Sequence, residues 1–131
     1  MEFTVERPLP PKQLHPNGGG KWHWGMIARL KKETRLAACY STLEVFSQSS
    51  IELINGCKYD VHLRFYLKSK RSLANSDENN MGEWAKADTD GISDAMDIDD
   101  KHFKSPTVEL LVDPDRHESR RLVITIRRAG R

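Results

Sequence analysis

Alternating apolar and polar positions predict four β-strands. The clearest run covers residues 58–68, where five apolar side chains fall on one face: Tyr59, Val61, Leu63, Phe65 and Leu67. Runs at residues 3–5, 107–112 and 121–127 are shorter but have the composition of strands. In the 58–68 strand, one face therefore covers a core, and the opposite face is polar enough to meet solvent or a ligand.

Apolar residues spaced three and four apart predict two helices. The first extends from residue 25 to about residue 47, with small and apolar side chains on one face: Ile27, Leu30, Thr34, Ala37, Ala38 and Ser41. Its small residues should let this helix pack closely on a sheet. The second extends from about residue 80 to residue 96, with these residues at helical spacing: Met81, Trp84, Ala85, Asp88, Ile92, Ala95 and Met96. Gly82 and Gly91 lower its helix propensity, so tertiary packing must hold it.

The order of these elements, β-α-β-α-β-β, predicts an α+β fold with two helices packed on a mixed sheet of about four strands. A loop rich in proline and glycine covers residues 9–20, and the conformation of the apolar segment 51–54 stays open. With 131 residues and no internal repeat, the chain is expected to form one domain over residues 1–131.

Composition narrows the class of protein. Hydrophobic residues make up 37% of the chain and charged residues 31%, and no apolar run approaches the roughly 18 residues of a membrane span. We therefore expect no membrane partner. Cys39 and Cys57 lack the spacing of metal ligands, which favours reduced thiols in a cytoplasmic protein. A pI near 8.6 permits a nucleic-acid partner without requiring one.

The acidic residues are concentrated in one short window. Residues 77–100 contain nine Asp or Glu and one Lys, a net charge of −8, whereas residues 1–76 carry +6 and residues 101–131 carry +4. Crowded carboxylates repel one another unless a cation lies among them, and Mg²⁺ prefers oxygen ligands. Basic flanks suit a polyanion that bridges metal and protein. The alternative is a solvated acidic helix with capping acids at its start.

Basic and aromatic residues are candidate DNA contacts. Lys21 and Trp22 follow three glycines, and this pair suits a phosphate backbone and an unstacked base. Alternatively, Trp22 or Trp24 closes one end of the core. The other candidate cations lie on the first helix and before the acidic window: Arg29, Lys31, Lys32, Arg35, Lys70 and Arg71. For the helix, a solvated basic face is the alternative to DNA contact.

The order of these motifs resembles the RusA family of Holliday-junction resolvases, found in phages and prophages. That family has an Asp-x-Asp-Asn motif before a helix with a conserved lysine, then an Asp-Gly step and a closing Asp-Asp pair. The corresponding positions here are residues 77–80, Lys86, residues 90–92 and Asp99-Asp100. The opening is similar too, from Pro10-Pro11 through residues 15–17 to the basic helix. The resemblance covers residues 1 to about 110, and its specificity lies in the joint order of the motifs.

The resemblance implies a metal-dependent endodeoxyribonuclease that resolves Holliday junctions and other branched DNA in recombination and repair. Asp77 and Asp100 would be catalytic and would bind the metal, and Lys86 would stabilise charge on the scissile phosphate. Mg²⁺, or else Mn²⁺, would be held by Asp77, Asn79, Asp99 and Asp100. The family acts as a C₂ homodimer on four-way junctions, here in the cytoplasm of a bacterial host.

Asn79 departs from the family, which has an aspartate at this position. An amide oxygen can bind Mg²⁺, but it brings no charge and cannot act as a base. Asp99 or Glu78 could substitute, metal affinity could be lower, or the chain could bind junctions without cutting them. A helix of about 16 residues is about 24 Å long. Asp77 and Asp100 can therefore share a metal only if the chain folds back after Met96, if the helix is shorter, or if a dimer completes the site.

Each site residue also has a structural alternative. Asp77 or Asn79 could cap the second helix, and Asp99-Asp100 could be an ordinary turn. Lys86 could pair with a neighbouring acid on the helix surface, either Glu83 or Asp90. Under these alternatives the chain would be an α+β interaction module with a solvated acidic face.

Overall fold

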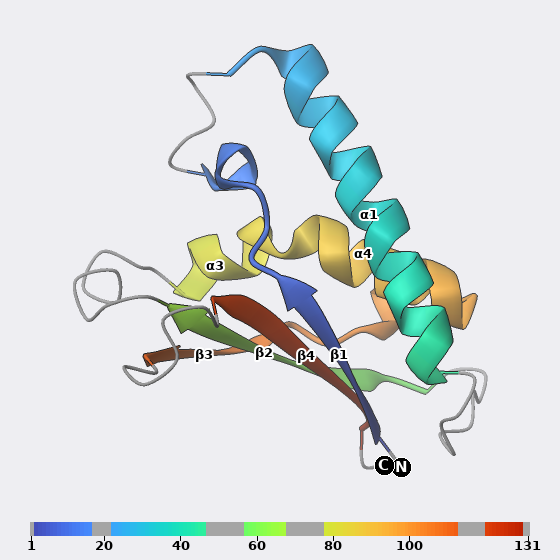
Figure 1. The fold of residues 1–131 in the computed structure, drawn as a ribbon. Coiled ribbons are helices and arrows are strands. Elements are labelled where there is room, and N and C mark those ends of the chain that lie inside the picture. The colour runs from blue at the N-terminus through green and yellow to red at the C-terminus, as the bar shows by residue number, and fades with distance from the viewer. Residues whose placement is uncertain (1, 17–21, 47–56, 68–77, 113–119, 130–131) are drawn as a thin grey trace.

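The computed structural model describes residues 2–16, 22–46, 57–67, 78–112 and 120–129. One sheet contains the strands β1 (Glu2–Pro8), β2 (Tyr59–Leu67), β3 (Thr107–Val112) and β4 (Arg121–Arg128). The helices α1 (Trp24–Phe46), α3 (Glu78–Trp84) and α4 (Lys86–Met96) lie on one side of it (Figure 1). The described residues also form two short 3-10 helices, η1 (Lys12–Leu14) and η3 (Asp100–His102). The predicted α+β class is confirmed.

The sheet is mixed, with the strand order β1-β4-β2-β3. β4 pairs antiparallel with both β1 and β2, whereas β2 and β3 are parallel. Parallel neighbours need a crossover connection, and α3 and α4 provide it between β2 and β3. β1 is an edge strand longer than the predicted run, and an edge position accommodates Pro8, which has no N–H to donate.

The core lies between the sheet and the helices. The predicted apolar face of β2 is buried, and Leu122, Ile124 and Ile126 of β4 are fully buried beside it. Met81, Ala85, Ile92 and Met96 of the helical segments close this core from above. Polar residues of β2 on the opposite face, such as His62 and Arg64, stay partly exposed. Among the described helices, none is long and apolar enough to cross a membrane.

α1 packs mainly across α4, which corrects the expectation that it lies directly on the sheet (Figure 1). Its buried residues are Thr34, Ala38 and Thr42, whereas Ala37, predicted on this face, is exposed. Gly91 makes the crossing possible, because a Cβ there would collide with the carbonyl oxygen of Arg35 and lie 2.8 Å from the Cβ of Ala38. The small residues therefore serve a helix–helix contact.

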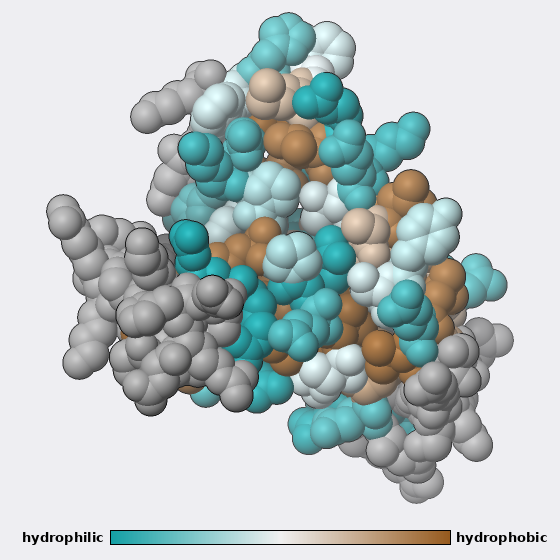
Figure 2. All heavy atoms as spheres, viewed as in Figure 1, coloured by the Kyte–Doolittle hydropathy of each residue, from teal (hydrophilic) through white to brown (hydrophobic). Residues whose placement is uncertain are grey.

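The outer surface of α1 mixes hydrophobic and hydrophilic side chains (Figure 2). Leu36, Tyr40 and Leu43 are each more than two-fifths exposed, and Trp24 is 78% exposed. Trp24 therefore does not close the core. The tryptophan that packs against the core is Trp84.

The predicted helix over residues 80–96 is bent at Ala85, which separates α3 from α4. Ala85 has φ −88° and ψ 3°, between helix and turn geometry. Backbone hydrogen bonds reach the bend from both sides: the Ala85 N–H donates to the carbonyl oxygen of Met81 at 3.2 Å, and the Thr89 N–H donates to that of Ala85 at 3.0 Å. Gly82 weakens the helix before the bend, and the burial of Ala85 holds this point against the core. Two short helices therefore replace the single one predicted.

Candidate functional site

A sharp turn after α4 sends the chain back along the helix. Asp97 has left-handed backbone angles, φ 55° and ψ 44°, and the Ile98 N–H donates to the carbonyl oxygen of Ser93 at 3.1 Å. Together with a second bond, from the Asp97 N–H to the carbonyl oxygen of Asp94 at 3.1 Å, it forms a Schellman motif. Aspartate tolerates the left-handed conformation better than most residues with a Cβ. The eleven residues of α4 rise about 16 Å, and Asp99, which is extended, leads from the turn to η3. The chain therefore folds back after Met96.

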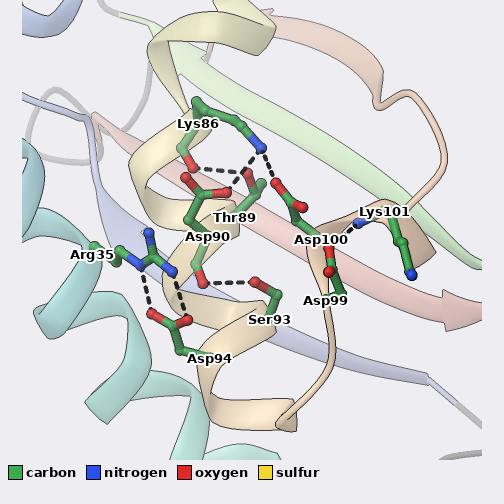
Figure 3. A network of polar contacts seen from close by, with 9 residues as sticks. All are labelled: Arg35, Lys86, Thr89, Asp90, Ser93, Asp94, Asp99, Asp100 and Lys101. Carbon is green, nitrogen blue, oxygen red and sulfur yellow. Dashed lines mark hydrogen bonds and ion pairs between the residues drawn. The ribbon is translucent and has the colours of Figure 1, made fainter.

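The reversal brings Asp100 to Lys86. The Nζ of Lys86 donates to Oδ2 of Asp100 at 2.8 Å and lies 2.9 Å from Oδ1 of Asp90 (Figure 3). Lys86 and Asp90 stand one turn apart at the start of α4, whereas Asp100 begins η3. Two carboxylates from separate segments thus converge on one ammonium group. We call Lys86, Asp90 and Asp100 together the Lys86 cluster.

Charge interactions in the Lys86 cluster keep Lys86 and Asp100 ionised at neutral pH. Partial burial would lower the pKa of Lys86, but its hydrogen bond to Asp100 and its ion pair with Asp90 outweigh this effect and raise it. The hydrogen bond from Lys86, supported by one involving Asp99, lowers the pKa of Asp100. Because the side chains of Lys86 and Asp100 are about half exposed, their ion pair adds little to folding stability. Its importance lies in placing oxygens and a cation side by side.

Asp99 has a different role from Asp100. Its Oδ1 accepts a hydrogen bond from the Lys101 N–H at 3.0 Å and so caps η3. The turn interpretation of the closing pair therefore holds for Asp99, whereas the side chain of Asp100 turns toward Lys86.

Several predicted site residues cannot be placed. Lys21, Lys70, Arg71 and Asp77 lie outside the described residues, and Asn79 belongs to the first turn of α3. Within the described ranges, no group of three or more His, Cys, Asp or Glu side chains could hold a metal ion.

The Lys86 cluster fits a divalent cation in part. Asp90 and Asp100 already converge on one cation, and carboxylate oxygens are the ligands that Mg²⁺ prefers. A complete shell needs further oxygens, for which Asp77 and Asn79 are the candidates. Asp90 was not among the predicted metal ligands. Its spacing of four residues from Lys86 was the signal for this contact, and pairing of Lys86 with Asp90 was one of the structural alternatives.

The predicted DNA contacts on α1 fall into two groups. Lys31, Lys32 and Arg35 line a hollow that Lys86 also lines. Arg35 additionally binds both carboxylate oxygens of Asp94, at 2.6 and 2.7 Å, and thereby joins α1 to α4 (Figure 3). Arg29 is exposed outside this hollow, and its Nε lies 3.8 Å from Oε1 of Glu33.

Trp22, the remaining predicted contact in the described residues, is half-buried. The Nζ of Lys12 lies 6.0 Å from its ring centre, within the range of a cation–π interaction. This contact links η1 to the residues just before α1.

Asp88 is a buried acid that sequence reasoning placed on a helix face without a role. Its Oδ1 accepts a 2.9 Å hydrogen bond from Arg7 of β1, and the same guanidinium donates to Ser41 of α1 at 3.3 Å. Burial raises the pKa of Asp88 to about 6, against the opposing effect of Arg7. The contact joins the strand to both helices.

Two comparisons with known proteins found no relative of this chain. No protein-family model matches the chain, and a search of curated proteins found no match.

Proposed function

We propose that this chain is a metal-dependent endonuclease that cuts branched DNA, with Asp100 and Lys86 at its catalytic centre. The observation that carries the proposal is the return of Asp100 to Lys86, fourteen residues away in the sequence, at a distance of 2.8 Å. The same two residues match positions in the motifs of the family that the sequence resembles. The neighbouring cations of α1 supply the positive surface that a DNA backbone requires.

In the proposed reaction, Mg²⁺ would be held by Asp77 and Asp100, with oxygens of Asn79 and Asp90 completing the shell. When bound, the metal would polarise a phosphoryl oxygen and lower the pKa of an attacking water. Lys86 would hold its ammonium group beside the scissile phosphate and stabilise the charge that grows there. Two such sites in a homodimer would cut a four-way junction symmetrically.

A second candidate is a branched-DNA-binding protein that does not cut. Two observations favour it: Asn79 lacks the charge of an aspartate, and the ammonium group of Lys86 already pairs with both Asp90 and Asp100. A divalent ion must compete with that ammonium group for the same oxygens. Binding without cleavage, under every metal condition, would identify this second function.

Paired aspartate variants separate the two functions. Asp77→Asn and Asp100→Asn should each abolish cleavage of a labelled four-way junction while retaining its binding in a gel-shift assay. Asp60→Asn is the matched control, because Asp60 belongs to β2 and pairs with Lys104 and Arg127 outside the Lys86 cluster. It should cut like the unmodified protein. Cleavage by either test variant at the unmodified rate would show that the catalytic residues are assigned wrongly.

A further inference from the structure

A groove of about 730 Å³ lies between η1 with its following residues, the first half of α1, and the bend between α3 and α4. Its lining includes His15, Ile27, Lys31, Lys32, Trp84 and Lys86. This volume falls in the range of roughly 300–1,000 Å³ that is typical of sites for small organic ligands. The groove is therefore large enough for a nucleotide.

The aromatic part of the groove is held in place by several contacts. The Nε1–H of Trp84 donates to the carbonyl oxygen of Pro11 at 2.8 Å, and the indole stacks on Phe65 with ring centres 5.8 Å apart. His15 meets Trp84 edge-on, with ring centres 5.3 Å apart. A rigid aromatic surface can stack a nucleobase at a small entropic cost, because its side chains are already ordered.

The cationic part of the groove is available for an anion. Lys31 and Lys32 are exposed, and neither forms an ion pair within the described residues, unlike Arg29 and Arg35 on the same helix. On the opposite side the groove is lined by two acids, Glu83 and Asp90, of which Asp90 pairs with Lys86. The four cations of the lining still outnumber these two acids. Two unpaired ammonium groups beside an apolar, aromatic lining match a ligand that carries a phosphate next to a flat ring.

The groove adjoins the candidate nuclease site. Glu83 and Lys86 line it and also line a second hollow of about 570 Å³, which contains Asp100. A strand that passes from the groove over Lys86 would therefore reach Asp100 within a short distance.

We infer that this groove binds one unstacked nucleotide of single-stranded DNA next to the scissile phosphate, with the base against His15, Ile27 and Trp84 and a phosphate at Lys31 and Lys32. The choice of DNA as the ligand rests on the proposed function. Such a nucleotide occurs at a branch point, where base pairing is interrupted, so the groove would help the protein to distinguish branched from fully paired DNA.

The test measures binding in EDTA, so that cleavage plays no part in the readout. Three fluorescein-labelled 12-mers would be titrated by anisotropy: oligothymidylate, an abasic strand with the same backbone, and a paired duplex. Stacking of one base predicts that oligothymidylate binds roughly fivefold or more tightly than the abasic strand. Equal affinities for these two strands would overturn the inference.

Variants locate the binding to the groove. Lys31→Gln combined with Lys32→Gln should lower the affinity for both single strands about tenfold. It should also reduce the slope of log affinity against log salt by up to about 1.4. Arg127→Gln, which removes a charge from β4, should change neither the affinity nor the slope. His15→Ala and Ile27→Ser should weaken the binding of oligothymidylate but not that of the abasic strand. If the double lysine variant and Arg127→Gln behave alike, the strand binds elsewhere and the inference fails.

The outcome is separable from that of the proposed nuclease. A protein that cuts four-way junctions but does not distinguish oligothymidylate from the abasic strand retains the proposed function and lacks the nucleotide groove. A protein that binds oligothymidylate through the groove but never cuts DNA retains the groove and loses the nuclease.

Discussion

At the scale of single residues, Asp88 shows how burial changes the chemistry of an acid. Its side chain is 1% exposed, and among the described residues its Oδ2 has no hydrogen-bond partner. Arg7 stabilises the ionised form, but not enough to compensate for the loss of water, so the pKa rises from 3.8 to about 6. Ionised Asp88 is therefore less favourable in the folded chain than in the unfolded chain.

The pH dependence of unfolding should reveal this effect. Because the folded state binds the proton more tightly, the contribution of Asp88 to stability is present below about pH 4 and is lost as the pH rises through about 6. The free energy of unfolding of the unmodified protein should fall by about 2 kcal/mol relative to Asp88→Asn between about pH 4 and 7. Urea unfolding of both proteins measures this difference, and parallel pH profiles would contradict it.

The residues of the candidate site were only partly predictable from sequence. The order Lys86, Asp90, Asp99, Asp100 is visible in the sequence, and the spacing of Lys86 and Asp90 predicts contact on a helix. The 2.8 Å contact between Lys86 and Asp100 depends on the left-handed turn at Asp97, a position where glycine is the usual signal. The Arg7–Asp88 contact joins residues that are 81 positions apart in the chain, so no local sequence pattern predicts it.

At the scale of elements, the crossing of α1 over α4 depends on the missing side chain of Gly91. Gly91→Ala should destabilise the fold by about 1–3 kcal/mol, because the new methyl group collides with the backbone of α1 and the helices must separate. Thermal or urea unfolding would measure the loss.

Gly82→Ala is the matched control for Gly91→Ala. A Cβ at Gly82 would meet Pro106 at 3.6 Å, an ordinary contact, so this variant should gain up to about 1 kcal/mol from helix propensity. Equal effects of the two substitutions would show that the tight crossing of α1 and α4 is wrong.

The two helices illustrate what periodicity can predict. It located both helical segments and the buried face of β2, because burial on one side imposes a regular spacing. It did not locate the bend at Ala85, because the helical spacing of apolar residues continues from Met81 to Ile92 across it. It also assigned the small face of α1 to the sheet, because small residues indicate close packing without identifying the partner.

At the scale of the whole molecule, charge is divided between the acidic Lys86 cluster and the cations of α1. If DNA binds across this surface, its affinity must fall with salt as counterions are released. Two phosphate contacts alone predict about a tenfold loss of four-way-junction affinity between about 50 and 200 mM monovalent salt. Fluorescence anisotropy with a labelled junction measures this, and an affinity independent of salt would exclude the proposed DNA surface.

The most direct test of the proposed function is incubation of the purified protein with a labelled synthetic four-way junction in Mg²⁺, in Mn²⁺ and in EDTA. We predict paired symmetric nicks with either metal and none in EDTA, and loss of the nicks in Asp100→Asn with binding retained. Binding without nicks under both metals would contradict a nuclease and favour the non-catalytic alternative. Absence of both binding and nicks would leave the Lys86 cluster as a solvated acidic surface.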